Sequence, residues 1–370
     1  MRILFSAVPS AGHLLPMLPL AEAARQDGHE VAVITNAELA SLVGTVPLLT
    51  AGPTLAELTA ESTRRCGGVG PDQPGPAAVE FFVGTRIDLT FDQALEQARA
   101  FGPDLIVAEA IDHVGPMVAA ALDVPWAMHA LSQVLPPPLL QAFDEAAAAC
   151  YAARGLTATS RLAYVDPLPD LMHAPESELP EDRISVQPQA YDRPDAEWVP
   201  PVFPGREDRP RVLVTLGTTI GDPAMPRDLA ALAETADVTV IVTFGAGSDV
   251  SAVDVDRTRV HPVGFVPLAR LLPHVDLVVS VAGTGTVLAT LAAGLPMVLM
   301  PVHADQPWNA ERAVKAGLAV AITEPGEAAT AVRTVLANPG YAAEARAAAE
   351  SIRAMPTPAQ ALTALIARIG

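Results

Sequence analysis

Residues 277–306 constrain the fold of this chain more than any other segment. An apolar run typical of a buried strand leads into a glycine-rich turn, a helix and a second apolar strand. A turn of this kind at the start of a helix presents backbone N–H groups without helical partners, a usual way to hold phosphate. The segment therefore predicts a nucleotide ligand, held by the turn residues Ala282, Gly283, Thr284, Gly285 and Thr286.

The length and the charge of the chain limit its architecture and its partners. Its 370 residues exceed the roughly 250–300 at which a single hydrophobic core stops growing, so two domains are expected. With 23 basic and 42 acidic residues the net charge is −19. Because such a chain is repelled by nucleic-acid phosphates and by anionic lipid, neither nucleic acid nor membrane is an expected partner.

Lysine and cysteine are scarce enough to exclude other classes of site. The only lysine is Lys315, whereas a Walker-type phosphate loop needs a lysine within the loop. Cys66 and Cys150 are too few and too far apart in sequence for a zinc site or a disulfide framework. The apolar N-terminal run ends at Pro9, too soon for a signal peptide, and no apolar stretch reaches the roughly 18 residues of a membrane span. We expect a soluble, cytoplasmic protein.

Strand and helix patterns alternate along the chain. Residues 2–8, 14–27 and 30–35 predict a strand, a helix and a strand, which is the opening of a parallel α/β sheet. The same order recurs at residues 104–128, while residues 131–163 are predicted to be helical. It then restarts in a second series of strands at 211–216, 238–243, 277–281 and 297–300, with helices at 226–235, 286–293 and 306–315.

The two series are separated by a proline-rich stretch that suits neither a helix nor a strand. The fold class predicted is therefore α/β, with two tandem doubly wound, Rossmann-like parallel-sheet domains. Such sheets bind ligands at the carboxyl ends of their strands, so two facing domains would form a cleft. The predicted boundaries are an N-terminal domain at 1–195, a linker at 196–210, a C-terminal domain at 211–352 and a final helical segment at 353–370.

Three polar residues lie where acid–base chemistry would be expected in the first domain. His13 follows the first strand, so it is expected at the carboxyl edge of that sheet, where a histidine can take a proton from an alcohol. Glu109 and Asp112 follow the strand that ends near Ala108, and either carboxylate could hold the imidazole. A histidine that only caps a helix, and acids that are only solvated, remain open alternatives.

In the second domain Asp305 and Gln306 follow a strand at the same edge as the glycine-rich turn, and such side chains suit sugar hydroxyls. The alternative is a tight turn that binds no ligand. Residues 254–256 have the Asp-x-Asp spacing of some metal sites, but they lie in a polar stretch with no apolar strand after it. No metal is therefore predicted.

Three segments carry a family resemblance. Residues 12–21, which begin with Gly12 and His13, residues 264–279 and residues 292–306 are similar to the natural-product glycosyltransferases of the GT-B fold, which decorate macrolides, enediynes and aromatic polyketides in actinomycetes. The resemblance implies an inverting, metal-independent sugar transfer to a hydroxyl of a hydrophobic natural-product aglycone in antibiotic biosynthesis. The co-substrate would be a nucleotide diphosphate sugar, often a dTDP-deoxysugar, with no further cofactor.

The resemblance also implies roles for individual residues. The base falls on His13, and its orienting acid falls on Glu109 or, less surely, on Asp112. The final helix of the family usually crosses back onto the N-terminal domain. The donor positions are base stacking at Phe265, base pairing to the backbone of Val266, diphosphate contacts at residues 282–286, Gly217 and Thr218, and sugar contacts at Asp305 and Gln306.

The sequence departs from the family at the glycine-rich turn. The family commonly has His-Gly-Gly where this chain has Val281, Ala282 and Gly283, so the phosphate-contacting histidine is absent. A hydrogen bond to a charged group contributes roughly 1.5–3 kcal/mol, so donor binding is expected to weaken by about one to two powers of ten. Phe265 occupies a position where tryptophan is frequent, which keeps an aromatic face.

The acceptor is expected against loops of the N-terminal domain at residues 66–85 and 131–151, which are rich in apolar and aromatic side chains. Two other functions remain open: a nucleotide-sugar epimerase of the same fold, and a catalytically silent auxiliary protein. A homodimer is an expectation that no residue pattern supports.

Overall fold

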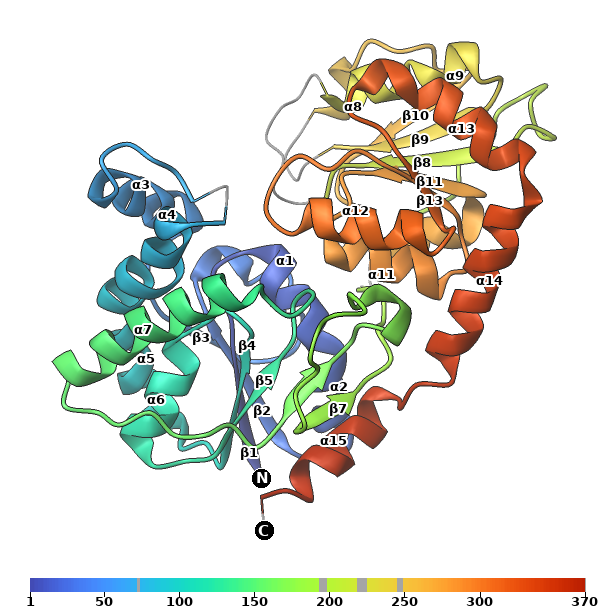
Figure 1. Cartoon of the computed structure of the whole chain (residues 1–370). Helices are drawn as coiled ribbons and strands as arrows, with labels where there is room; N and C mark the ends of the chain where they lie inside the picture. The colour runs from blue at the N-terminus through green and yellow to red at the C-terminus, as the bar shows by residue number, and fades with distance from the viewer. Residues whose placement is uncertain (72–73, 193–197, 218–224, 245–248, 370) are drawn as a thin grey trace. The chain divides into compact units, whose positions relative to one another are not determined.

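The computed structural model describes residues 1–71, 74–192, 198–217, 225–244 and 249–369. The chain divides into two compact units (Figure 1). Unit 1 comprises Met1–Leu168, Pro175–Gln187 and Met355–Gly370, and unit 2 comprises Pro169–Ala174 and Pro188–Ala354. Each unit is built on one parallel sheet, which confirms the predicted α/β fold class.

Unit 1 contains a seven-stranded sheet in the order β3-β2-β1-β4-β5-β6-β7, with every neighbouring pair parallel. Its strands are β1 (Arg2–Ser6), β2 (Glu30–Thr35), β3 (Leu48–Thr50), β4 (Leu105–Glu109), β5 (Trp126–His129), β6 (Tyr164–Asp166) and β7 (Arg183–Ser185). The short strands β3, β6 and β7 were not predicted, because three residues are too few to show a period of two.

Helices cover both faces of this sheet, since side chains along a strand alternate between them. Ile3 and Phe5 of β1 lie in one apolar cluster with α2 and α15, while Leu4 lies in another with α5 and α6. The C-terminal helix α15 packs against α2 through Leu362 and Leu365. The helices of unit 1 are α1 (Ala11–Leu14), η1 (Leu15–Met17), α2 (Leu18–Gln26), η2 (Ala37–Leu39), α3 (Leu55–Arg65), α4 (Pro76–Val79), η3 (Glu80–Thr85), α5 (Arg86–Phe101), α6 (Val114–Leu122), α7 (Pro137–Ala153) and α15 (Pro358–Ile366).

Two predictions for unit 1 were too coarse. Helix α7 occupies only part of the predicted helical region 131–163: three successive prolines end at its start, and Gly155, at φ +65°, follows its last turn. The predicted loop at residues 66–85 is helical from Pro76 onward, where α4 continues into the π-helix η3. Loop-like composition at residues 66–75 masked the helix that follows it.

Unit 2 contains a six-stranded parallel sheet in the order β10-β9-β8-β11-β12-β13. Its strands are β8 (Arg211–Thr215), β9 (Thr239–Thr243), β10 (Val260–Val263), β11 (Leu277–Ser280), β12 (Met297–Leu299) and β13 (Ala319–Ala321). The structure adds β10 and β13 at the edges of the sheet. Val212, Val240 and Val279 pack with α13 on one face of the sheet.

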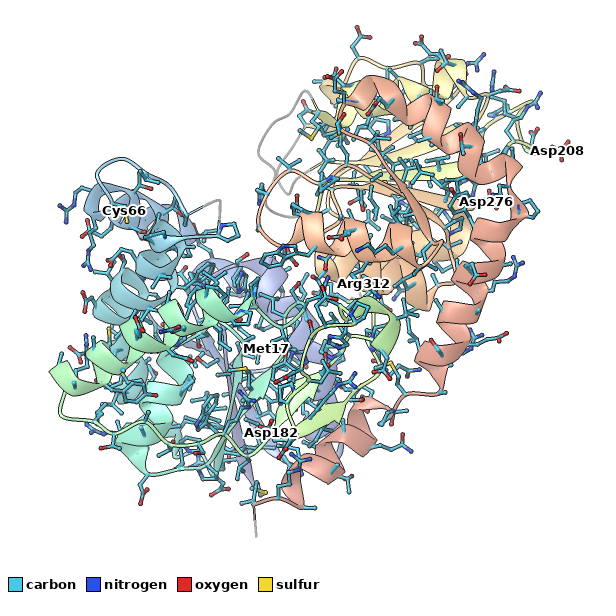
Figure 2. The ribbon with its side chains drawn as sticks, viewed as in Figure 1. Met17, Cys66, Asp182, Asp208, Asp276 and Arg312 are labelled. Atoms are coloured by element: carbon cyan, nitrogen blue, oxygen red, sulfur yellow. The ribbon has the colours of Figure 1, made fainter. Side chains whose placement is uncertain are left out.

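The helices of unit 2 include one segment drawn from the first half of the sequence, η4, whose Leu171 carbonyl accepts a hydrogen bond from Arg312 on α12 at 2.9 Å. Arg312 is labelled in Figure 2. The described helices of unit 2 are η4 (Asp170–Met172), α8 (Met225–Ala230), α9 (Leu232–Thr235), η5 (Val250–Ala252), α10 (Leu268–Leu271), η6 (Leu272–His274), α11 (Thr284–Ala292), α12 (Gln306–Lys315), η7 (Pro325–Glu327), α13 (Ala328–Ala337) and α14 (Pro339–Arg353).

The strand order of each sheet reverses once. In unit 1 the reversal lies between the neighbours β1 and β4, and in unit 2 it lies between β8 and β11. At such a point the connections leave the sheet in opposite directions, which opens a crevice at the carboxyl ends of the strands. The segments that carry His13 and the glycine-rich turn each follow a strand at one of these points.

Candidate functional site

His13 and Glu109 form a hydrogen-bonded pair at the carboxyl edge of unit 1. The imidazole Nδ1 lies 2.9 Å from Glu109 Oε1. His13 belongs to α1, just after β1, and Glu109 is the last residue of the adjacent strand β4. The Glu109 side chain is fully buried, whereas 16% of the His13 side chain is exposed. The imidazole is therefore held from beneath and keeps an exposed face.

The protonation state of Glu109 follows from its partners. Burial on its own would raise the pKa of this carboxyl, but the charge and hydrogen bond of His13 act against it, as do the backbone N–H groups of Ile111 and Val8. The net effect lowers the pKa of Glu109 below its ordinary value. Glu109 is thus an anion at neutral pH, as an acid that orients a histidine base must be.

Asp112 does not take part in this pair. Its carboxylate accepts hydrogen bonds from Ser6 Oγ and the backbone N–H of Gly115, and it forms an ion pair with the buried Arg86 at 3.3 Å. Of the two acids proposed from the sequence, the structure brings only Glu109 to His13. Glu109 and Asp112 are only three residues apart, and their spacing in the sequence does not show which of them reaches His13.

Aromatic side chains continue from His13 into the helices of unit 1. The ring of Phe82 lies 5.7 Å from the imidazole of His13, and Phe143 on α7 lies 6.2 Å from Phe82. His113 stacks on Phe143 at 5.6 Å with an interplanar angle of 7°. Phe82 and Phe143 come from the two ranges, 66–85 and 131–151, that the sequence assigned to the acceptor. The structure brings those ranges together beside His13.

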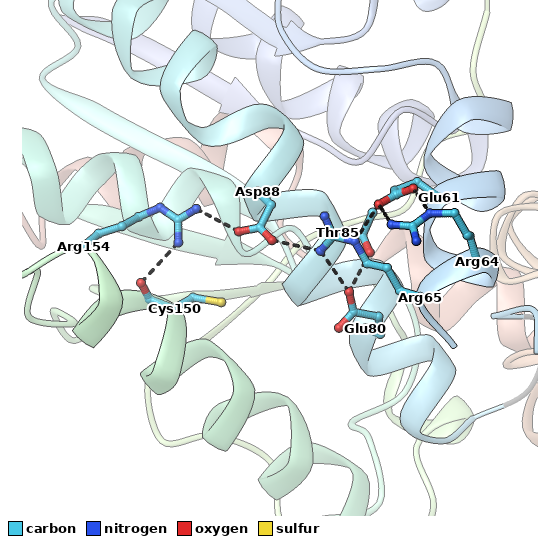
Figure 3. A network of polar contacts seen from close by, with 8 residues as sticks. All are labelled: Glu61, Arg64, Arg65, Glu80, Thr85, Asp88, Cys150 and Arg154. Carbon is cyan, nitrogen blue, oxygen red and sulfur yellow. Dashed lines mark hydrogen bonds and ion pairs between the residues drawn. The ribbon is translucent and has the colours of Figure 1, made fainter. Parts of the chain in front are cut away.

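Phe82 lies on η3, a π-helix, which is a rare element that often occurs at functional sites. Polar contacts fix this element to its neighbours (Figure 3). Glu80 accepts hydrogen bonds from Thr85 at 2.7 Å and from Arg65 on α3 at 3.2 Å. Arg65 also binds Asp88 on α5, which in turn binds Arg154. This network links α3, η3, α5 and the residue that follows α7.

In unit 2 the glycine-rich turn joins β11 to α11. Ala282 has a φ of +64°, a left-handed conformation that glycine adopts more readily. Gly283 is the N-cap of α11 and has no side chain to accept from the first-turn N–H groups. Helix geometry leaves those N–H groups without partners inside the helix, so they and the helix dipole suit an anion. Thr284, Gly285 and Thr286 form the first turn.

Asp305 and Thr284 are joined directly, and Asn309 completes the connection. Thr284 Oγ1 donates to Asp305 Oδ2, and Asn309 Nδ2 lies 2.8 Å from Thr284 Oγ1, 2.9 Å from Asp305 Oδ2 and 3.0 Å from the carbonyl of Ala282. Asn309 is 1% exposed. The sequence did not single it out, although its spacing of four residues from Asp305 on a helix places both on one face.

Gln306 has a structural task in the same region. It is buried, and its side-chain carbonyl accepts from the backbone N–H groups of Val302 and His303 at 2.8 and 3.1 Å. Its oxygen therefore shapes the loop after β12. Asp305 is partly exposed. The pair predicted to bind sugar together thus divides into a partly exposed carboxylate and a buried amide.

The remaining donor candidates lie on other loops of unit 2. Phe265 follows β10 and is 39% exposed, so its ring is accessible, and Val266 beside it is partly buried. Gly217, just beyond β8, has a φ of +69°. Thr218 lies outside the described residues. Both Gly217 and the turn at residues 282–286 follow the strands at which the order of the unit 2 sheet reverses.

Comparisons with known proteins indicate which class of protein carries this fold. Residues 227–368 match the family described as erythromycin biosynthesis protein CIII-like, C-terminal domain. The L-demethylnoviosyl transferase of Streptomyces niveus is 29% identical and aligns over 86% of this chain and 85% of its own. The elloramycin glycosyltransferase ElmGT of Streptomyces olivaceus is 29% identical and aligns over 100% of this chain and 98% of its own.

Solved structures extend the likeness to the whole fold. The Streptomyces sp. SF2575 glycosyltransferase SsfS6, solved with thymidine diphosphate, has a TM-score of 0.80 and 26% identity over 99% of both chains. SnogD of Streptomyces nogalater has a TM-score of 0.78 and 26% identity over 100% of this chain and 99% of its own. The chain is a natural-product glycosyltransferase with the GT-B fold.

Val281 occupies the position at which the sequence resemblance implied a phosphate-contacting histidine. Its side chain is 3% exposed and packs in the apolar core of unit 2. No titratable group replaces the missing histidine at this position. An anion at this turn would meet backbone N–H groups and the threonine hydroxyls.

Two further observations concern possible metal-ligating side chains and the lengths of the helices. Asp256 of the Asp-x-Asp segment accepts hydrogen bonds from the backbone and hydroxyl of Thr258, which is a local turn. No group of three or more metal-ligating side chains occurs among the described residues. Within the same part of the chain, no helix has the length and apolar character needed to cross a bilayer.

Proposed function

We propose that this glycosyltransferase moves a deoxysugar from a dTDP-linked donor to a hydroxyl of a hydrophobic aglycone, with inversion at the anomeric carbon. The observation that carries the proposal is the His13–Glu109 pair at 2.9 Å, with a buried anionic carboxylate beneath a partly exposed imidazole. A histidine held in this way can accept the proton of an attacking hydroxyl.

In the proposed step the acceptor hydroxyl lies against His13 and attacks the anomeric carbon from the face opposite the leaving diphosphate. His13 takes the hydroxyl proton as the new C–O bond forms and the bond to the diphosphate oxygen breaks. Glu109 stabilises the imidazolium that results. A single displacement of this kind inverts the configuration at the anomeric carbon.

The donor diphosphate is proposed to lie at the turn of residues 282–286. First-turn N–H groups of α11 and the hydroxyls of Thr284 and Thr286 would meet the charge that develops on the leaving group, a preorganised electrostatic contribution. Asp305 would accept from a sugar hydroxyl, and Phe265 would stack on the base. The complex of SsfS6 with thymidine diphosphate supports a thymidine nucleotide for this chain as well.

The acceptor is proposed to lie beside Phe82, whose partly buried ring adjoins the imidazole of His13. Relatives named as a tylactone mycaminosyltransferase and an aklavinone 7-beta-L-rhodosaminyltransferase support large, largely apolar aglycones as the acceptor class. Macrolide and aromatic polyketide acceptors both meet this description. A homodimer and a cytoplasmic location stay predictions.

Two measurements test the proposal. Thermal-shift titration with thymidine, uridine and guanosine diphosphates should show stabilisation by the thymidine nucleotide above the other two. Transfer from dTDP-deoxysugars to a panel of macrolide and polyketide aglycones, followed by NMR of the product, should give the anomer opposite to that of the donor. Retention of configuration would contradict the base mechanism, and sugar released as an epimer without acceptor would favour an epimerase.

A further inference from the structure

A second buried ion pair lies beneath the proposed catalytic residues. Arg86 on α5 is 1% exposed and Asp112, just after β4, is 1% exposed. The guanidinium Nη2 lies 3.3 Å from Asp112 Oδ1. An apolar pair of similar volume is often as stable as a buried ion pair, so burial of this kind calls for an explanation other than stability.

The contacts of Arg86 connect three elements. Its Nη1 donates to Thr90 at 2.8 Å, one turn further along α5. Its Nη2 donates to the carbonyl of Ala7 at 3.0 Å, directly after β1, as well as to Asp112. Among the described residues nothing accepts from its Nε. The guanidinium therefore bridges the ends of β1 and β4 while its Nε has no acceptor among the described residues.

Asp112 strengthens the same bridge from the other side. Its second carboxylate oxygen accepts from Ser6 Oγ, on the last residue of β1, and from the backbone N–H of Gly115 at 3.3 Å. Together Arg86 and Asp112 contact two successive residues of the chain that leaves β1. They also fix the turn that leaves β4 and enters α6.

These two segments carry the proposed base and its acid. Ala7 is followed by Val8, whose N–H lies 3.5 Å from Glu109 Oε1. Ser10, two residues later, accepts the backbone hydrogen bond of His13 at 3.1 Å. Asp112 lies three residues beyond Glu109, and its backbone N–H donates to the Glu109 carbonyl at 3.0 Å. The separation of the two segments sets the distance between the imidazole and its acid.

Two glycines keep the bridge closely packed. A Cβ on Gly115 would lie 2.8 Å from the Cβ of Ala108 and 2.9 Å from that of Ser6. A Cβ on Gly52, which has a φ of +79°, would lie 2.4 Å from Thr90 Oγ1 and 3.1 Å from Arg86 Nη1. Both positions accept only glycine without displacing a member of the bridge.

We propose that Arg86 is a positioning residue for the transfer reaction, which acts through Asp112 and the Ala7 carbonyl to hold His13 and Glu109 at hydrogen-bond distance. This role rests on the proposed function of His13 as the base. In this proposal Asp112 does not orient the imidazole but anchors the bridge that Arg86 makes between the ends of β1 and β4. A displacement of about 1 Å at a reacting group can cost 10²-fold in rate. Loss of the Arg86–Asp112 bridge is therefore expected to slow turnover without a change in donor affinity.

The test uses the full chain and a matched pair of arginines. R86M keeps the length of the side chain but removes its charge and donors, and R86K restores one charge. R183M is the control: Arg183 on β7 pairs at 2.7 Å with the equally buried carboxylate of Asp166 on β6, away from β1 and β4 in the sheet. Steady-state kinetics are measured well below the melting temperature of each variant, with donor KM and kcat determined separately.

R86M is expected to lower kcat by about 10²-fold with donor KM within about twofold, and R86K is expected to recover part of that loss. R183M is expected to keep kcat within about threefold even if its melting temperature falls as far as that of R86M. If R86M does not fold, R86K decides: it should lose kcat, while R183K does not. Wild-type kcat in R86M would overturn the proposal, as would wild-type kcat in R86K if R86M does not fold, or an equal loss of kcat in R183M. A His13→Ala enzyme with full activity would instead refute the proposed base, which separates the two failures.

Discussion

The equivalent crevices of the two sheets hold different kinds of polar group. In unit 1 the edge between β1 and β4 holds the buried charges Glu109, Asp112 and Arg86 beneath His13. In unit 2 the edge beside β11 holds a helix N-terminus, hydroxyls and amides, with Asp305 as the carboxylate that joins the turn. A proton acceptor needs a side chain whose charge changes during the reaction, and buried partners tune that charge. An anion site needs only fixed dipoles, which backbone supplies.

The largest effect is expected at the base itself. His13→Ala should lower kcat by about 10²–10⁴-fold, because a positioned base contributes that much, while the affinity for thymidine diphosphate stays unchanged. Glu109→Gln, which removes the charge but keeps the shape, should give a smaller loss. Steady-state kinetics measure kcat, and calorimetric titration measures the affinity for thymidine diphosphate. His29→Ala, at the amino end of the same sheet, is the control, and a similar loss there would remove the distinction between the two edges.

Unit 1 should also carry a pH dependence of stability. His129, which pairs with Glu109 in the register of β4 and β5, is buried, and burial lowers its pKa to about 4 from 6.5. Below pH 6.5 the unfolded chain takes up a proton that the folded chain refuses. The free energy of unfolding should therefore fall as the pH drops from about 6.5 to about 4, by about 3 kcal/mol in total.

Urea denaturation of the wild type and of His129→Asn over this pH range measures that contribution as the difference between the two curves. The partly exposed His261 of unit 2, whose pKa burial also lowers, provides the matched variant His261→Asn. Its effect should be smaller, because less of its surroundings excludes water. If the unfolding free energies of the two variants depended equally on pH, the effect of a buried histidine would not be specific to the edge of unit 1.

A third prediction concerns the amide that connects the donor side. Asn309→Ala removes hydrogen bonds to Ala282, Thr284 and Asp305, so the turn and the loop after β12 lose their common anchor. Affinity for thymidine diphosphate should fall about tenfold, as loss of roughly 1.4 kcal/mol implies. Isothermal titration calorimetry measures it. Asn338→Ala, which removes the N-cap of α14, should reduce stability but leave the affinity unchanged.

The smallest expected effect tests backbone strain at the glycine-rich turn. Ala282→Gly should raise the free energy of unfolding by ~0.5–1 kcal/mol, because an L-residue at a φ of +64° is strained and glycine is not. Ala347→Gly on the exposed face of α14 should lower it by about 1 kcal/mol. Thermal denaturation of the two variants gives opposite shifts. A loss of stability in Ala282→Gly would mean that the Ala282 side chain stabilises the turn.

The predictable part of the fold was the set of long, apolar elements. β2 has the predicted bounds, and β11 follows from its unbroken apolar run. The three-residue strands β3, β6, β7 and β13 and the π-helix η3 were missed, because their identity depends on hydrogen bonds to distant neighbours. Near the site, spacing placed Glu109 and Asp112 equally close to His13, and only the path of the turn after β4 separates their tasks. Arg86 gave no signal, since an arginine in a helix is ordinarily an exposed residue.

The sequence by itself determined the fold class, the resemblance to natural-product glycosyltransferases and the loops on which chemistry was expected. These follow from local order: apolar runs make strands, glycine-rich turns open helices, and parallel sheets gather their loops at one edge. The tertiary structure decided which side chains meet there. It paired His13 with Glu109, gave Asp112 to Arg86, and brought Asn309 to the turn whose histidine is missing. Those contacts join residues up to 96 positions apart along the chain, and only packing of the sheets brings them together.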